Sequence, residues 1–310
     1  MEKRPQNCSD WGWERKLFRK SSFESDRIIF MKKIITHINP DLDAVAAVWV
    51  IKRFLLGWEE AEVGFVEATA DGEKIPGVDS DPEVLYVDVG RGRLDHHQTN
   101  DYLSATKLCW DYVLEQREYQ PLKEIEKEAG GRLVEIVTQI DNAKDLNWKE
   151  VGETRYYFYL HILIDGLRGL GESDRQVLEF GFRALDAVFL TLKNKIRAEE
   201  DLKNGKEFQT PWGKAIALES ANKRVLWEGE IQGFVIVVKK DPKNGAVQIY
   251  ARPDSKVNLA TAYQKIKKID SSADWFLHAS GRLLLNESSV NPNMRPTKLT
   301  LEQIIEVLKS

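Results

Sequence analysis

The stretch KKIITHINPDLDAVAAVWVIKRFLLG at residues 32–57 constrains the fold more than any other part of the chain. It opens with a short β-branched run, which is typical of a buried strand. The polar residues NPDLD end this run, and the residues after them have the apolar spacing of a helix that ends near Gly57. A strand followed directly by a helix is the repeating unit of parallel α/β sheets.

The alternation of strand and helix continues through the first half of the chain. Residues 62–68 and 83–90 are predicted strands, and ATKLCWDYVLEQ from Ala105 onward is a predicted helix. Residues 122–146 are predicted helices with an interruption at Gly130-Gly131. We therefore predict an α/β domain over residues 31–165, with a mainly parallel sheet flanked by helices.

The pattern changes in the second half. Apolar residues at helical spacing over 174–203 predict a helical connector within residues 166–205. Residues 206–310 are then expected to form a smaller α+β domain. Its predicted strands are residues 213–220, 233–240 and 247–253, and its predicted helices are residues 258–269 and 300–309. Thr300 and Gln303 have the spacing of a capping box for the last helix.

Length and composition fit a protein of two globular domains. The chain has 310 residues, 42% of them hydrophobic and 30% charged, and no apolar run approaches the length of a membrane span. Its two cysteines, Cys8 and Cys109, are far apart, so we expect no disulfide, no cysteine-based zinc site and a reducing, cytoplasmic location. The sequence is compatible with either a monomer or a homodimer of this chain.

Charge divides along the chain. Residues 31–200 hold 21 Lys and Arg against 32 Asp and Glu, whereas residues 201–310 hold 17 against 12. An acidic half can host cations and a basic half can attract phosphates, although both halves can equally be solvated surfaces. Residues 1–30 have no clear period and no secretory core, so we interpret them as an N-terminal extension, or as residues upstream of a start at Met31.

Four segments place metal-type ligands at the ends of predicted strands and helices. They are His37 with Asp41 and Asp43, then Asp88, then Asp95-His96-His97, and finally Asp141. In an open α/β sheet, groups at the carboxyl ends of strands converge on one crevice. The sequence therefore predicts that these segments meet, although each alone is also compatible with a cap, a turn or a core residue.

Carboxylates and imidazoles without thiolates suit Mn²⁺ or Mg²⁺ best, with Zn²⁺ or Co²⁺ as further options. One aspartate can bridge two such ions at about 3.5–4 Å, which makes a clamp for attack on phosphorus. We therefore expect two divalent ions, with Mn²⁺ first.

The segments THINPDLDA, VDVG, LDHHQ and QIDNAKD resemble the four motifs of the DHH phosphoesterase superfamily over residues 32–145. That superfamily includes RecJ-type exonucleases, nanoRNases and family II inorganic pyrophosphatases. The resemblance implies one metal held by His37, Asp41 and Asp88. It implies a second metal held by Asp43, Asp88, His96 and Asp141. It also implies that His97 faces the substrate phosphate and that Asp95 orients a histidine.

In the second half, WFLHASGRLLLNESS at residues 275–289 is similar to the HASG stretch of Myg-type exonucleases. His278, Ser280 and the amides around Gly281 are expected to bind a phosphate, with Arg282 and Arg252 adding charge-assisted contacts. A core strand with a satisfied histidine is the alternative. Arg295, in the loop NPNMRPT, is a weaker phosphate-binding candidate. The run Gly90-Arg91-Gly92-Arg93 is interpreted as a turn, with phosphate contacts from its two arginines as the alternative.

Residues 155–165, RYYFYLHILID, are interpreted as core, and His161 within them as structural. The leading functional hypothesis is a two-metal phosphoesterase that acts on short oligonucleotides or single-stranded nucleic acid, with no membrane partner. A pyrophosphatase-like phosphatase of phosphoanhydrides or small nucleotides and a non-catalytic nucleotide-binding regulator are the alternatives.

Overall fold

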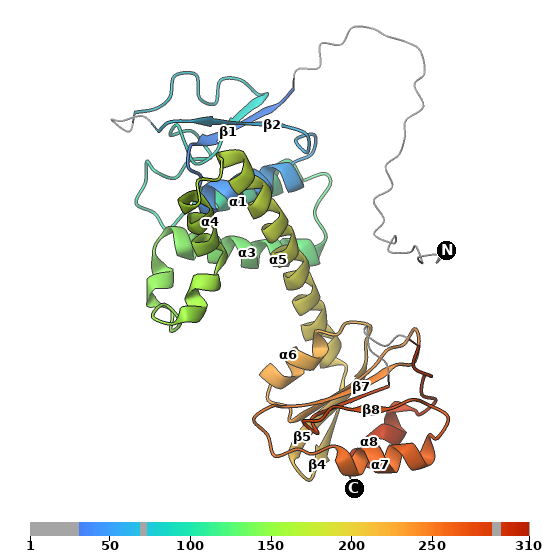
Figure 1. Ribbon diagram of the computed structural model, residues 1–310. Coiled ribbons are helices and arrows are strands. Elements are labelled where there is room, and N and C mark those ends of the chain that lie inside the picture. Colours follow the sequence, from blue (N-terminus) through green and yellow to red (C-terminus); the bar gives the residue numbers. More distant parts are fainter. Residues whose placement is uncertain (1–30, 69–72, 287–292, 310) are drawn as a thin grey trace, which may run out of the picture.

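The computed structural model describes residues 31–68, 73–286 and 293–309. The predicted extension 1–30, with Cys8, lies outside these residues, as does part of the loop NPNMRPT. The described chain contains two separate sheets joined by one long helix, α5 (Asp174–Lys203) (Figure 1). It is a mixed α/β structure with one parallel and one mixed sheet.

The first sheet has three parallel strands in the order β2-β1-β3, which confirms the predicted parallel pairing. Its strands are β1 (Lys33–His37), β2 (Glu62–Val66) and β3 (Val84–Tyr86). An isolated parallel bridge between Val87 and Leu94 places the DHH segment beside the end of β3. This arrangement brings the second and third sequence segments together.

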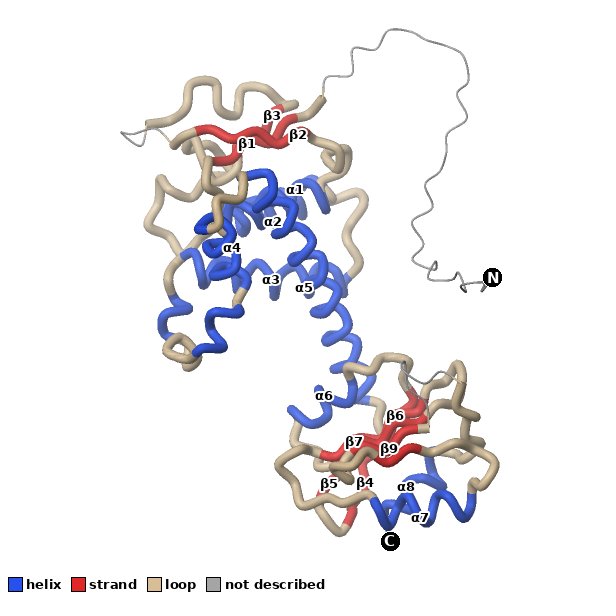
Figure 2. The backbone as a smooth tube through the Cα atoms, in the orientation of Figure 1, coloured by secondary structure: helices blue, strands red, loops and turns tan. Residues whose placement is uncertain are grey.

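Helices lie on one side of this sheet (Figures 1 and 2). They are α1 (Leu42–Phe54), α2 (Ala105–Gln116), α3 (Glu124–Asp141), α4 (Leu160–Gly169) and α5, with 3₁₀ turns η1 (Lys144–Asn147) and η2 (Thr154–Phe158). Helix α1 is buried over nearly its whole length, because its apolar side chains contact both the sheet and the other helices. The result is one hydrophobic core that runs from Ile34 to Phe189.

The predicted helix break at Gly130-Gly131 is wrong, since α3 is continuous from Glu124 to Asp141. A Cβ atom on Gly130 would come within 2.3 Å of the Trp110 indole, whereas nothing lies within 4 Å of one on Gly131. Gly130 therefore permits close packing of α3 against α2 rather than ending the helix.

The interpretation of residues 155–165 as core is also incorrect. They form η2 and part of α4, and the side chains of Tyr157 and Phe158 are 64% and 75% exposed. The aromatic composition of this stretch does not show which of its rings face solvent. Composition alone therefore overestimated how much of the stretch is buried.

The second sheet has six strands in the order β4-β5-β6-β7-β9-β8, with only β5 and β6 parallel. Its strands are β4 (Lys206–Thr210), β5 (Gly213–Glu219), β6 (Ile236–Lys240), β7 (Val247–Ala251), β8 (Phe276–Leu277) and β9 (Leu283–Leu285). Helices α7 (Ala260–Ile269) and α8 (Leu301–Lys309) cover one face, while α6 (Val225–Ile231) and the end of α5 pack on the other (Figure 2). The predicted capping box is confirmed, because Thr300 N donates to Gln303 Oε1 and Gln303 N donates to Thr300 Oγ1.

Candidate metal centre

The candidate ligands of the first half come together at the carboxyl end of the first sheet. His37 is the last residue of β1, and Asp41 caps α1 by accepting a hydrogen bond from Ala44 N. Asp88 follows β3, and Asp141 is the last residue of α3. The gathering follows from parallel strands, whose carboxyl ends share one edge.

Asp88 lies at the middle of the cluster. Its side chain is 3% exposed, and its Oδ2 atom lies 3.3 Å from His37 Nε2 while its Oδ1 atom lies 3.4 Å from His96 Nε2. The Asp88 backbone has a φ of 57°, a left-handed conformation that is uncommon for a residue with a side chain. Strained backbone of this kind concentrates at functional positions.

Asp88 Oδ1 is also buried, and although His96 Nε2 lies 3.4 Å away, no residue that the structure describes makes a well-aligned hydrogen bond to it. Burying a carboxylate oxygen without a donor is costly, so such an atom needs a compensating partner. A divalent cation is a suitable one, since carboxylate oxygen is the ligand that Mn²⁺ and Mg²⁺ prefer.

Asp43, His96 and Asp141 form a second group beside Asp88. His96 Nε2 lies 3.7 Å from Asp43 Oδ2 and 3.6 Å from Asp141 Oδ2. The buried Asp43 carboxylate also accepts hydrogen bonds from Ala105 N at 2.7 Å and Thr106 N at 2.9 Å. These amides begin α2, so Asp43 is fixed by the amino end of that helix.

Negative charge is crowded in this group. Burial and the neighbouring carboxylates of Asp88 and Asp141 raise the pKa of Asp43 to about 8, against the lowering effect of its bonds to Thr106. Burial also raises the pKa of Asp141 to about 6. A bound cation would relieve this repulsion, because it favours the charged form of each carboxylate.

The two histidines that touch Asp88 respond in the opposite sense. Burial lowers the pKa of His37, but its hydrogen bond and charge interaction with Asp88 outweigh this and raise the pKa to about 9. The close contact with Asp88 likewise raises the pKa of His96 to about 9. His37 Nδ1 donates to the Ile38 carbonyl at 2.7 Å, which leaves Nε2 as the ligand atom of a neutral ring.

His97 is held differently from His96. Its Nδ1 lies 2.7 Å from Asp95 Oδ1, and Asp95 is itself buried and accepts bonds from the amides of His97 and Arg91. The hydrogen bond with Asp95 raises the pKa of His97. The His97 side chain is 57% exposed, so its ring reaches the cavity in front of Asp88.

The arrangement fits divalent metal ions. Three groups have ligand atoms within 4.8 Å of one another, namely His37 with Asp41 and Asp88, Asp43 with His96 and Asp141, and Asp88 with His96 and His97. All the donors are carboxylate oxygens or imidazole nitrogens, a set that suits Mn²⁺ or Mg²⁺. Asp88 and His96 each belong to two of these groups, so the three groups form one connected cluster.

A cavity of about 640 Å³ opens in front of the cluster. Of the expected ligands, His37, Asp41, Asp88 and Asp141 line it. It is also lined by Arg91 of the Gly-Arg-Gly-Arg run, and by Glu67 and Glu73, which the sequence reasoning missed. Glu67 directly follows β2, so the rule that placed His37 and Asp88 at strand ends could also have found Glu67.

The second predicted group of site residues lies on the other sheet. The HASGR segment is the turn between β8 and β9, with His278 Nδ1 2.9 Å from Ser280 Oγ and Gly281 at a φ of 69°. The Arg282 side chain donates to the Ser255 carbonyl. Arg252 forms a two-point ion pair with Asp254, and Arg295 pairs with Asp274. Arg252 is therefore already occupied, and a phosphate at this turn would have to compete with the Asp254 carboxylate for it.

No protein-family model and no curated protein sequence matches the chain. Among solved structures it is similar to RecJ in complex with Mg²⁺ from Thermus thermophilus, with 12% identity and a TM-score of 0.29 over 90% of this chain and 49% of that one. This chain thus spans about half the length of that RecJ chain. It is also similar to exonuclease RecJ bound to manganese, with 10% identity and a TM-score of 0.30 over 90% of this chain and 89% of that one.

Within the described ranges, no helix has both the length and the apolar character needed to cross a membrane.

Proposed function

We propose that this chain is a metal-dependent hydrolase of phosphodiester bonds, with short oligonucleotides or single-stranded nucleic acid as substrates. The observation that supports the proposal is the position of Asp88 within the cluster of ligand atoms, with one buried oxygen that lacks a well-aligned hydrogen bond from the described residues. In a metal clamp for phosphoryl chemistry, one carboxylate shared by two cations has this position.

His37, Asp41 and Asp88 would hold one divalent ion, and Asp43, Asp88, His96 and Asp141 the other, with Mn²⁺ preferred. When bound, such ions lower the pKa of an attacking water and neutralise charge on the phosphate. The protein's part is to fix the ligands: the amino end of α2 orients Asp43, and the Ile38 carbonyl orients His37.

His97 is proposed to face the substrate. Asp95 holds its Nδ1, which leaves Nε2 without a hydrogen-bond partner among the described residues. A protonated His97 would present an Nε2–H to a phosphate oxygen or to the leaving group. Asp95 would act through His97 by fixing the orientation of its ring and stabilising its charged form.

The second half is proposed to bind the substrate, and we retain 31–165, 166–205 and 206–310 as the proposed metal-binding domain, connector and substrate-binding domain. His278, Ser280, Gly281, Arg282 and Arg252 are the proposed phosphate contacts. Of these, Ser280 and the amides around Gly281 need the least rearrangement, because Arg252 is already paired with Asp254.

A screen of turnover with Mn²⁺ tests the proposal. The substrates are pyrophosphate, a linear dinucleotide, a cyclic dinucleotide and end-labelled oligomers. We expect hydrolysis of the dinucleotide or the oligomers, lost by at least about a thousandfold in Asp88→Asn and retained in Asp111→Asn, a surface carboxylate on α2. Turnover of pyrophosphate alone would favour a phosphoanhydride hydrolase, and metal binding without any turnover would favour a nucleotide-binding regulator.

A further inference from the structure

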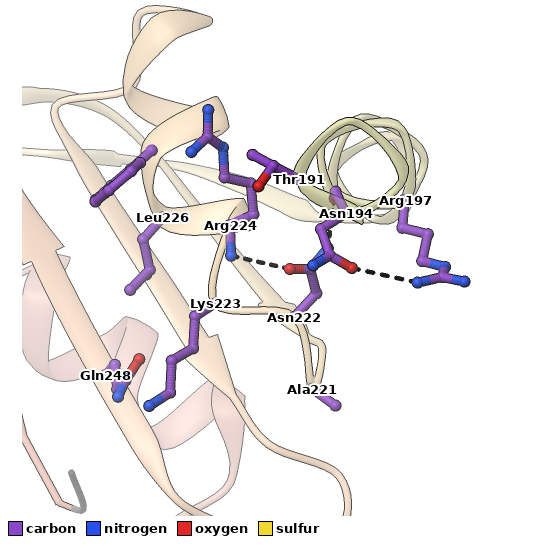
Figure 3. Close-up of a pocket in the computed structure, with 10 residues that line it drawn as sticks. Thr191, Asn194, Arg197, Ala221, Asn222, Lys223, Arg224, Leu226 and Gln248 are labelled. Atoms are coloured by element: carbon purple, nitrogen blue, oxygen red, sulfur yellow. Dashed lines mark hydrogen bonds between the residues drawn. The ribbon is translucent and has the colours of Figure 1, made fainter. Parts of the chain in front are cut away.

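A second cavity, of about 760 Å³, lies where α5 meets the second sheet. Its walls come from α5, from the loop between β5 and α6, from α6 and from the start of β7 (Figure 3). Strands β5 and β7 lie on either side of β6 and run in opposite directions, so the carboxyl end of β5 and the amino end of β7 lie at the same edge of the sheet. The HASGR turn and Arg252 lie at the other end of these strands. This groove is therefore separate from both proposed sites.

Basic side chains are spread along the groove. Lys223 extends toward Gln248, and Arg197 lies on the other side of Asn222 (Figure 3). Both cationic side chains are exposed, and among the described residues neither makes an ion pair with a carboxylate. Cations that do not converge on one point suit a ligand that carries several separated negative charges.

Acidic groups do not cancel this charge. The buried carboxylate of Glu228 is shared by Lys195, at 2.7 Å, and Arg224, at 3.0 Å. Lys195 also pairs with Glu199 at 3.0 Å, and Glu199 is itself shared with Arg132 of α3. These carboxylates are therefore engaged by other cations, and Arg197 and Lys223 add positive charge without an ion pair to a described carboxylate. The groove consequently has a positive potential that favours anions.

An aromatic ring stands beside these cations. The Trp227 indole is 56% exposed, and the Arg224 guanidinium carbon lies 4.8 Å from its ring centroid. An exposed indole next to arginine offers a stacking surface for a nucleobase, because every base presents a π face and arginine adds a cation–π contribution. An acidic peptide would use the cations and leave the indole unused.

The groove is held in place by hydrogen bonds rather than formed by a loose loop. Asn222 Nδ2 donates to the Asn194 carbonyl at 2.7 Å, and Asn222 Oδ1 accepts from Arg224 N at 3.0 Å (Figure 3). Ser220 Oγ, which accepts from Asn222 N, donates to Asp201 of α5. The loop main chain that carries Lys223 and Arg224 is therefore held against α5 before any ligand binds, which lowers the entropic cost of binding.

We propose that this groove binds single-stranded nucleic acid, with phosphates at Arg197 and Lys223 and a base stacked on Trp227. The proposal rests on the proposed function for the identity of the ligand. The groove would add a contact for the nucleic acid outside the metal centre and the HASGR turn.

The test measures binding of fluorescein-labelled single-stranded 12-mers of DNA and RNA to the full chain by anisotropy, in EDTA so that no hydrolysis takes place. The double variant Arg197→Gln/Lys223→Gln is expected to bind about tenfold more weakly. Its slope of log affinity against log salt is expected to fall by about 0.7 for each cation removed. The matched control is Lys268→Gln/Lys298→Gln, since both lysines are exposed and Lys268 lies on α7, across the sheet from α6. It should bind as the parent does.

Trp227→Leu tests the stacking contact and is expected to weaken binding by about five- to a hundredfold. Its control is Tyr119→Leu, at an aromatic ring that is 92% exposed and outside the groove. Circular dichroism confirms that each variant is folded.

The proposal is overturned if the groove variants bind the 12-mers as tightly as the parent does. It is also overturned if polyglutamate, at a charge concentration equal to that of the 12-mers, displaces the 12-mers from the parent. Neither result bears on hydrolysis at the metal centre, which Asp88→Asn tests separately. Conversely, loss of binding in the groove variants of a chain that hydrolyses no phosphodiester would support the groove and reject the proposed function.

Discussion

Asp43 and Thr106 are hydrogen-bonded to each other twice, although they lie 63 positions apart in the sequence. Thr106 N donates to Asp43 Oδ1 at 2.9 Å, and Thr106 Oγ1 donates to the Asp43 carbonyl at 3.0 Å. Both residues are buried. The contact joins the first turn of α1 to the first turn of α2, and it orients a candidate metal ligand at the same time.

Replacing Thr106 by Val is expected to lower the free energy of unfolding by about 1 kcal/mol, because the buried hydroxyl bond is lost while the side-chain volume is kept. Metal affinity should fall as well, though by less than the removal of a ligand would cause, since the hydroxyl fixes the Asp43 main chain while the amide bonds to its carboxylate remain. Thr106→Ser keeps the hydroxyl and is the control for affinity. Urea unfolding and Mn²⁺ titration measure the two effects, and equal metal affinity in Thr106→Val and the parent would contradict the orienting role.

Asp141→Asn is expected to stabilise the chain without metal while weakening metal binding. Burial raises the pKa of Asp141 to about 6, so its charged form is disfavoured in the folded state. The parent therefore loses stability relative to the variant as pH rises from about 4 through about 6, and the difference should level off at roughly 1–3 kcal/mol. Urea unfolding in EDTA at pH 4 and pH 7 measures it, with Asp111→Asn as control. A variant that is less stable than the parent at pH 7 would refute the crowding of charge.

Metal binding at pH 7 is expected to release more than one proton per chain. His37 and His96 have pKa values of about 9, and Asp43 has one of about 8, so all three hold protons when no metal is bound. Ligands must lose these protons to coordinate a cation, and affinity for Mn²⁺ should therefore fall as pH falls from 9 to 6. Calorimetric titrations in buffers of different ionisation enthalpy count the protons. His96→Gln should release about one fewer, and heats that do not depend on the buffer would contradict the assignment.

Two adjacent glycines of α3 are expected to respond oppositely to alanine. A Cβ on Gly130 would lie 2.3 Å from the Trp110 ring, so Gly130→Ala should destabilise the chain by about 1–3 kcal/mol. Gly131 has open space around it, and Gly131→Ala should stabilise the chain by up to about 1 kcal/mol through helix propensity. Thermal unfolding of the two variants measures the difference, and stabilisation by both substitutions would show that α3 can move away from Trp110.

The sequence predicted what depends on local pattern. The strand–helix alternation that begins at Lys33 indicated the parallel sheet. Because the carboxyl ends of parallel strands share one edge, it also predicted that His37 and Asp88 lie together. Gly130 shows the limit, because a glycine that ends a helix and one that admits a neighbouring ring look the same in sequence. The bond between Asp43 and Thr106 was also beyond reach, since nothing local at either residue indicates its partner.

Helix α5 contributes fully buried side chains to the first core up to Phe189, and the half-buried Leu192 and Ile196 still pack against that core. From Ala198 onward the helix belongs to the core beside α6, so these last turns set the phase between the metal centre and the second sheet. One inserted residue there would turn the second sheet by about 100° about the helix axis and move it by only about 1.5 Å. Seven inserted residues would nearly restore its facing and move it by about 10 Å. The length of this connector is consequently restricted to steps that preserve the facing of the second sheet.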